Sequence, residues 1–510
     1  MGGAADGGAG VASGHPATTE AALGVLADGG NAFDAAVAAG FAAAAAEPAL
    51  TSLGGGGFLL ARRADGDARV FDFFVDNPGR GLPTRELEPH FVPVTIRFPG
   101  SEQVFNVGFG SVAVPGNLAG FLHVHERLGR LPLERVLAPA RVLAREGVEV
   151  NERQSYFLSL LEPIMTLTER GRALFAPDGR YAARGQRLAN PDLADFLEAL
   201  PADRGRDFYE GGLARRIAAE LHAGQGLLGT EDLAAYRVVE RAPLAADYRG
   251  HRLLTNPAPS FGGPLIALAL RLLAELPTQD GLPDAPESAL RLVSAMQEVD
   301  ALRREGCAGP EALDAGRAGE ARARVRSFSR GTTHVSVRDA EGNAASLTTS
   351  NGEGSGYVAP GTGIMLNNML GEDDLHPDGF FAQAPGERVA SMMAPSLLLR
   401  GDEIRLVLGS GGSKRIRTAL LQVLLNVVDH DLSLREAIER PRLHWDGEAL
   451  QVEPGLPAPA LSALAERCPV NEWSTRDVYF GGVHAVGRTE AAGDPRRGGS
   501  AAFAPGGASL

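Results

Sequence analysis

Two runs of strand composition between residues 333 and 350 constrain the fold more than any other stretch of the chain. Thr-His-Val-Ser-Val-Arg-Asp is followed by Ala-Glu-Gly-Asn and then by Ala-Ala-Ser-Leu-Thr-Thr-Ser. The middle four residues favour a turn, so the pattern predicts a β-hairpin. In the first strand Thr332, His334 and Ser336 would share a polar face. Taken alone, this pattern is also typical of any half-buried strand rich in threonine.

The segments around this hairpin alternate between helical and strand-like composition. A polar link rich in Ala, Gly and Arg precedes it at residues 305–331 and is the best candidate boundary. Helices are predicted at 18–46, where Asn31 would cap the second of two, and at 116–147, 190–245, 264–304 and 415–430. Strands are predicted at 58–63, 68–75 and 403–410, and a loose tail at 498–510. Such alternating layers favour an α+β or α/β sandwich.

Composition narrows the class of protein. The chain of 510 residues has 49 Lys+Arg against 63 Asp+Glu, and it has no basic run that would suit nucleic acid or an anionic membrane. No Lys or Arg precedes Arg62, so no secretory signal is visible, and the apolar run 35–46 is too short to span a bilayer of about 30 Å. We expect a cytoplasmic enzyme. Cys307 and Cys468 form no metal-binding or disulfide framework.

Several familiar sites are absent or weak. The chain has no G-x-S-x-G around a nucleophilic serine, and Gly-Ser-Gly-Gly-Ser-Lys at 409–414 lacks the spacing of a phosphate loop. His123 and His125 would face apart on a helix and so would not share a metal ion. Gly411 and Gly412, at a predicted helix start, either form an oxyanion hole or permit a tight turn. Lys414 either binds a ligand carboxylate or is solvated.

Read together, these segments resemble the γ-glutamyltransferase (glutathione hydrolase) family of N-terminal-nucleophile hydrolases. The resemblance rests on motifs spread along most of the chain: residues 29–36, Glu47-Pro48 followed by the glycines 54–57 and Phe58, residues 114–116, 129–132, 208–211 and 259–263, and Thr-Thr-His-Val-Ser-Val-x-Asp-x-x-Gly-Asn-Ala-x-Ser from Thr332. The four consecutive glycines also indicate backbone packed closely against another segment.

The resemblance implies a four-layer αββα sandwich and self-cleavage between Gly331 and Thr332. Residues 1–331 would form a large subunit and residues 332–510 a small catalytic one, held together as a heterodimer. Cleavage makes chemical sense, because the α-amine of an N-terminal threonine has a pKa near 7.7–8.0 and can act as the base for its own hydroxyl. No metal or organic cofactor is implied.

The resemblance also assigns roles to individual residues. Thr332 is implied as the nucleophile, Ser350 as the hydroxyl that orients it, and Gly411 with Gly412 as the oxyanion hole. Three further residues are implied to bind the donor: Asn351, Asp374, which would grip its α-amine, and Ser391, which would contact its carboxylate.

The chain departs from the family pattern in the donor pocket. Phe74 stands where the family has an Arg that clamps the donor α-carboxylate, and a phenyl ring cannot replace that bidentate contact. Ala390 replaces the first of two paired serines, the loop between Asn368 and Asp373 is two residues longer, and the loop after Ser350 is shorter. We therefore expect the acyl-transfer mechanism to be kept, with Lys414 or another Arg supplying the missing charge or with a different amide as donor.

These residues predict an autoprocessed threonine amidase that cleaves γ-glutamyl amides such as glutathione and passes the acyl group to water or an amine. An acylase for a non-glutamyl amide, such as a β-lactam side chain, is the alternative within the family. An unprocessed, inactive binding protein and a nucleotide-binding protein using residues 409–414 are the alternatives outside it.

Overall fold

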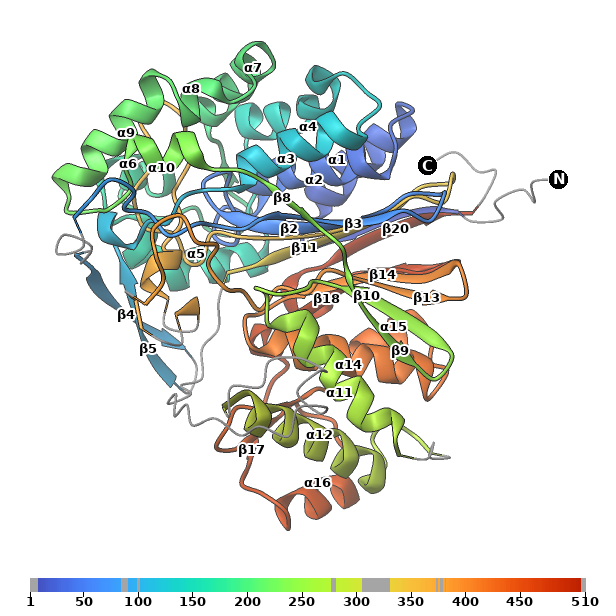
Figure 1. Cartoon of the computed structure of the whole chain (residues 1–510). Helices are drawn as coiled ribbons and strands as arrows, with labels where there is room; N and C mark the ends of the chain where they lie inside the picture. The colour runs from blue at the N-terminus through green and yellow to red at the C-terminus, as the bar shows by residue number, and fades with distance from the viewer. Residues whose placement is uncertain are drawn as a thin grey trace.

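The structure is a computed structural model of the single chain. It describes residues 8–83, 90–98, 101–276, 281–304, 331–372, 375–376, 379–380 and 382–505. Within these ranges no helix is long and apolar enough to cross a membrane. The described residues form two stacked β-sheets with helices on both outer faces (Figure 1).

Both sheets are antiparallel, and both mix strands from before and after residue 331. The first sheet has seven strands in the order β20 (Ser500–Ala504), β1 (Ala9–Ser13), β11 (Thr333–Arg338), β12 (Ala344–Ser350), β2 (Gly56–Arg62), β3 (Ala68–Phe73) and β8 (Val239–Arg241). The second has six, in the order β19 (Ala491–Ala492), β18 (Gly482–Val486), β14 (Glu403–Gly411), β13 (Ser396–Arg400), β10 (His251–Thr255) and β9 (Leu244–Tyr248).

Helices cover the outer face of each sheet (Figure 1). Those over the first sheet are α1 (Pro16–Ala27), α2 (Ala32–Ala46), α3 (Asn117–Leu128), α4 (Leu133–Glu146), α7 (Pro191–Asp203), α8 (Arg206–Tyr209), α9 (Gly212–Ala223) and α10 (Thr230–Ala235). Those over the second are α11 (Gly262–Ala274), α12 (Pro286–Arg304), α14 (Arg415–Val428) and α15 (Leu434–Glu439).

Smaller elements flank these four layers. Beside the first sheet lie α5 (Glu152–Met165), α6 (Glu169–Phe175), and the hairpins β4 (Val92–Phe98) with β5 (Ser101–Val107) and β6 (Val148–Glu149) with β7 (Arg187–Leu188). Next to α12 lie the helix α16 (Ala458–Ala465) and a sheet of β15 (Leu443–Trp445), β16 (Leu450–Val452) and β17 (Val470–Glu472).

Alternation along the strands divides the core into two main clusters. Val335, Leu347 and Phe71 of the first sheet pack toward α2 in one cluster. Phe58 and Phe74 belong to the other, which also contains residues of the second sheet, α11 and α14. Burial of apolar side chains on both faces of a sheet is what holds such layers together. The predicted four-layer αββα sandwich is therefore confirmed.

Two predictions about the course of the chain were wrong. Residues 239–245, expected to be helical, form β8 and the start of β9. Residues 500–504, expected in a loose tail, form the edge strand β20 and pair with β1 from Ala9↔Ala504 to Ser13↔Ser500. In each case the neighbouring strand supplies hydrogen-bond partners for backbone groups that the local sequence leaves open.

Candidate active site

The predicted nucleophile lies at the end of a row of residues that crosses four strands. Thr333 pairs with Thr349, Thr349 with Gly57, and Gly57 with Phe73. One residue further toward the same edge, the register brings Thr332, Ser350, Gly56 and Phe74 into line, with Ser350 paired to Gly56. Residues that face each other across antiparallel strands project to the same side of the sheet. Thr332, Ser350 and Phe74 therefore share one face.

This face points toward the second sheet. His334, two residues after Thr332, lies so close to Gly409 of β14 that a Cβ there would overlap its ring. His334 is fully buried between the hydroxyls of Thr348 (2.8 Å) and Ser336 (2.9 Å), and burial lowers its pKa well below the ordinary value. A histidine held in this way supports the packing of the two sheets, and its lowered pKa keeps the imidazole neutral.

Ser350 lies against the predicted cleavage site. Its hydroxyl donates a hydrogen bond to the carbonyl oxygen of Gly331, and the Ser350 hydroxyl oxygen accepts one from the Gly352 N–H at 2.9 Å. The hydroxyl is thereby oriented, with its hydrogen on the scissile carbonyl. A donor in this position polarises the carbonyl and stabilises the negative charge that develops when the carbonyl is attacked.

Gly411 lies beside Thr332, and Gly412 follows it beside Gly481 and Arg497. A Cβ at Gly411 would overlap the Thr332 carbonyl group, so only glycine allows this approach. Gly412 has a φ of +123°, a backbone conformation that disfavours other residues. The structure thus brings the predicted oxyanion glycines to the predicted nucleophile, just before α14.

The glycine run 54–57 is explained by close backbone packing, as predicted. A Cβ at Gly55 would overlap the carbonyl of Ser350, and a Cβ at Gly56 would lie 3.1 Å from the carbonyl carbon of Phe74. Because Gly56 has no side chain, the row has no side chain between Ser350 and Phe74. A Cβ at Gly56 would also lie 2.9 Å from the backbone nitrogen of Val75, so the close packing here favours glycine.

The turn after α2 supports the cleavage site from the other side. The carbonyl of Ala49 would lie 2.9 Å from a Cβ at Gly331. Glu47, which is only 2% exposed, accepts hydrogen bonds from Thr333 (2.7 Å) and Thr18 (2.9 Å). Burial raises the pKa of Glu47 to about 7, although both hydroxyls and the charge of Arg497 oppose the shift.

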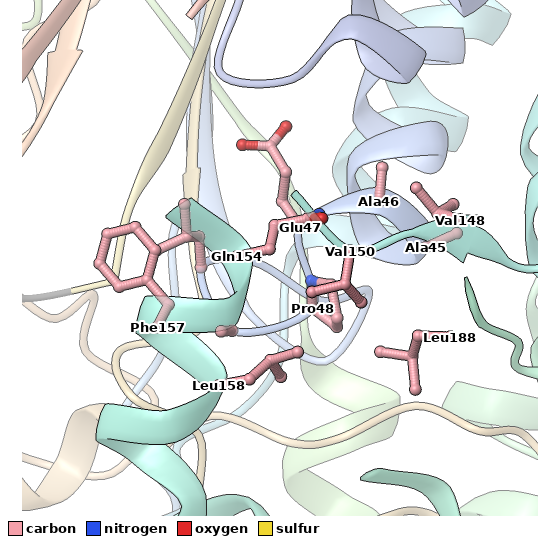
Figure 2. Close-up of a pocket in the computed structure, with 12 residues that line it drawn as sticks. Ala45, Ala46, Glu47, Pro48, Val148, Val150, Gln154, Phe157, Leu158 and Leu188 are labelled. Carbon is pink, nitrogen blue, oxygen red and sulfur yellow. The ribbon is translucent and has the colours of Figure 1, made fainter. Parts of the chain in front are cut away.

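A small, mainly apolar pocket of about 20 Å³ adjoins this turn (Figure 2). The carboxylate of Glu47 points away from the apolar side chains of Pro48, Leu158 and Leu188. Its position matches its hydrogen bonds to Thr333 and Thr18 instead. The Glu47 carboxylate therefore binds the start of β11, through Thr333, and does not point into the pocket.

The predicted donor-binding residues have different outcomes. Asn351 follows Ser350 directly, and its side-chain oxygen is buried without a hydrogen-bond partner among the described residues. Ser391 lies in the loop before β13, where its hydroxyl accepts a bond from Met393 N–H (3.1 Å) and its carbonyl accepts one from Ser260 (3.0 Å). Asp374 lies outside the described residues.

At the position of the family arginine, the structure places an aromatic pair. Phe74 is 1% exposed, and its ring stacks on Phe58 with 5.5 Å between centroids. Arg388 donates to the Phe74 carbonyl, but its guanidinium also forms ion pairs with Asp76 (3.1 Å) and Asp72 (3.6 Å). Its charge is therefore already compensated.

The structure also decides the environment of Lys414, His123 and His125. Lys414 is 7% exposed, so the prediction of a solvated side chain was wrong, because the whole start of α14, residues 415–418 included, is buried. His123 bonds Glu240 (3.0 Å) and His125 bonds the Leu131 carbonyl (2.8 Å), facing apart as predicted. Among the described residues no group of His, Cys, Asp or Glu is arranged to hold a metal ion.

Two residues beside the cleavage site were missed by sequence reasoning. Glu47 stood within a family motif but carried no assigned role. Arg497 was placed next to the expected tail, yet its guanidinium donates to the carbonyl of Thr332 at 3.3 Å. A pair of arginines followed by glycines gives no local signal for such a contact, because the two residues are 165 positions apart.

Comparison with known proteins finds matches along most of the chain. The family model of the gamma-glutamyltranspeptidases matches residues 18–317 and 317–504. The glutathione hydrolase proenzyme of Escherichia coli (strain K12) is 31% identical over 532 residues, covering 95% of this chain and 90% of the relative. The Acylase ACY 1 proenzyme of Pseudomonas sp. (strain SE83) is 34% identical over 481 residues, covering 90% and 86%.

A solved structure extends the similarity to three dimensions. The cephalosporin acylase from Bacillus halodurans superposes with a TM-score of 0.83 at 26% identity, covering 98% of this chain and 96% of that one. Both the sequence and the fold therefore match hydrolases of the N-terminal-nucleophile type. The chain belongs to the γ-glutamyltranspeptidase family.

Proposed function

We propose that this chain is a self-processing threonine amidase that uses Thr332 to cleave γ-glutamyl amides such as glutathione through an acyl-enzyme. The observation that carries the proposal is the Ser350 hydroxyl on the Gly331 carbonyl, beside Gly411 and within one register row of Thr332. A hydroxyl donor aimed at one particular peptide carbonyl fits cleavage at that bond.

Cleavage would begin when the Thr332 hydroxyl oxygen adds to the Gly331 carbonyl carbon. The C–N bond then breaks, the Thr332 nitrogen takes the proton, and an ester joins Gly331 to the threonine side chain. Water hydrolyses this ester, leaving a carboxylate on Gly331 and a free amine and hydroxyl on Thr332. Both sheets contain strands from both fragments, and those of the first sheet are interleaved, which supports a stable heterodimer after cleavage.

In turnover the new α-amine accepts the hydroxyl proton as Thr332 attacks the donor carbonyl. The negative charge that develops on the donor oxygen would face the backbone N–H groups of Gly411 and Gly412. The leaving amine takes the proton, and water or a second amine then attacks the acyl-enzyme. The relatives that bear hydrolase and acylase names support this reaction class.

The donor pocket favours recognition of the α-amine over recognition of the α-carboxylate. The buried oxygen of Asn351 has no hydrogen-bond partner among the described residues and suits an ammonium donor. Phe74 offers the carboxylate no charge, and Arg388 is held by two aspartates. The missing partner for the α-carboxylate supports a second candidate function, an acylase for a non-glutamyl amide such as a β-lactam side chain. The similarity to the cephalosporin acylase is consistent with this function.

Four p-nitroanilides separate the two functions, because they differ only in the groups on the acyl chain. The γ-glutamyl compound carries both α-groups, the 4-aminobutyryl compound lacks the carboxylate, the glutaryl compound lacks the amine, and the butyryl compound lacks both. A γ-glutamyl amidase has the highest kcat/KM on the first. An acylase without a carboxylate clamp cleaves the second or fourth at least as well. If the cleaved protein hydrolyses none of the four anilides and no cephalosporin amide, the proposal is contradicted.

A further inference from the structure

Arg497 is a buried cation whose hydrogen-bonded groups are backbone carbonyls. The side chain is 3% exposed, and it donates to the carbonyls of Thr332 (3.3 Å) and Val478 (3.2 Å). Its Nε has no hydrogen-bond partner, and no carboxylate lies within ion-pair distance in the part of the chain that the structure describes. Burying a guanidinium without an ion-pair partner is unfavourable, so its placement here indicates a functional role.

The Arg497 guanidinium lies beside the Thr332 carbonyl and the two glycines proposed to form the oxyanion hole. The guanidinium would lie 3.2 Å from a Cβ at Gly411 and 3.4 Å from one at Gly412. Because Thr332 N and the Thr332 carbonyl oxygen belong to one residue, and Arg497 lies 3.3 Å from that oxygen, the nearest guanidinium nitrogen lies within about 7 Å of the nitrogen that becomes the α-amine. Burial lowers the pKa of Arg497 to about 10, so the guanidinium still carries its charge near pH 7.

We propose that Arg497 is a positioning residue that fixes the Thr332 carbonyl and keeps the Thr332 α-amine unprotonated near neutral pH. This inference rests on the proposed function. A cation at this distance disfavours the ammonium form and so lowers the pKa of the amine. Only the free amine can accept the hydroxyl proton, so the effect of Arg497 is to extend activity to lower pH.

The other charged groups around Thr332 define the sign of the expected effects. Glu47 lies at the end of α2 and contacts Thr333, and as a carboxylate it opposes Arg497 by favouring the ammonium. Arg415, Arg442, Asp477 and Asp494 act on the guanidinium of Arg497 itself. Removing the charge of Arg497 should therefore raise the amine pKa, and removing that of Glu47 should lower it.

The test is the acidic limb of the pH profile of kcat/KM, measured on full-length protein that has cleaved itself. We expect the apparent pKa of the wild-type limb to lie about one unit below the 7.7–8.0 of an ordinary α-amine. Arg497→Gln keeps a donor but no charge, and its limb should move up by about one unit. Arg497→Lys keeps the charge and should stay near the wild type, whereas Glu47→Gln should move the limb down.

Any one of three results overturns the inference. The first is a wild-type limb with an apparent pKa at or above 7.7, and the second is the same apparent pKa for Arg497→Gln and the wild type. The third is an equal upward shift of the apparent pKa in Arg497→Gln and Arg497→Lys. If Arg497→Gln stays uncleaved, the wild-type and Arg497→Lys limbs decide, because both must lie below 7.7 and within about half a unit of each other. An uncleaved wild-type protein contradicts the proposed function instead, so the two failures are distinguishable.

Discussion

The row across β11, β12, β2 and β3 is polar at one end and aromatic at the other. At the Thr332 end, Ser350 bonds the scissile carbonyl and glycines pack against the nucleophile. At the Phe74 end, two stacked rings occupy the place of a family arginine. The two ends are three strands apart, or about 14 Å at ordinary strand spacing. We therefore propose that reaction mechanism and donor specificity reside in separable parts of one sheet.

The largest effect should come from the polar end. Thr332→Ala removes the nucleophile, so we expect a chain that stays whole and hydrolysis reduced by at least about 10⁴-fold. The measurements are the intact mass after prolonged incubation and the rate on the best of the four anilides.

Thr333→Ser is the matched control, because it keeps the hydroxyl that bonds Glu47, and it should cleave and turn over. A processed, active Thr332→Ala protein would move the nucleophile to another residue, such as Thr333, and would break the comparison.

Gly411→Ala should have the next largest effect. The added methyl group would overlap the Thr332 carbonyl, displacing the nucleophile or the N–H groups beside it. Loss of one such donor costs about 10²–10³ in kcat, and we expect a loss of this order together with slower cleavage.

Gly24→Ala provides the control for the same chemical change. Gly24 lies in the exposed part of α1, and a Cβ there meets nothing within 4 Å. The variant should keep full activity and gain up to about 1 kcal/mol of stability from helix propensity. Equal activities for the two variants would mean that Gly411 is not close to the reaction.

At the aromatic end, Phe74→Arg should change specificity more than rate. The new guanidinium would restore a carboxylate partner, and the ratio of kcat/KM for γ-glutamyl over 4-aminobutyryl anilide should rise about tenfold. Phe74→Leu removes the ring without adding charge and serves as the control. If both variants change the ratio equally, charge at this position does not select the donor, and the two ends are less separable than proposed.

The local patterns of the sequence predicted the elements but not their long-range pairing. The hairpin of β11 and β12, the Asn31 cap and α14 all follow from residues near one another in sequence. By contrast, β20 depends on β1, almost the whole chain away, and the burial of Lys414 depends on elements distant in sequence, such as β15 and β18, that contact α14. The nucleophile was assigned only through the family resemblance. The glycines also followed from their place before a predicted helix, but the contact of Arg497 with Thr332 required the structure.

The smallest effect concerns Glu47 and the pH dependence of stability. Burial raises its pKa from 4.5 to about 7, so the folded state holds the proton more tightly than the unfolded state. The resulting stabilisation is complete below the unfolded pKa and is lost as pH rises from about 4.5 to about 7. In Glu47→Gln this component is missing, so its unfolding temperature should fall less over that range, by a few degrees at most. Parallel curves for the two proteins would show that Glu47 titrates normally.

The intact mass of the purified protein under denaturing conditions, with the N-termini of its fragments identified, tests the central claim most directly. We predict two fragments, one ending at Gly331 and the other beginning at Thr332, whose masses add up to that of the chain plus one water. A single 53.3 kDa chain that remains whole on prolonged incubation would contradict self-processing and would favour an inactive binding protein.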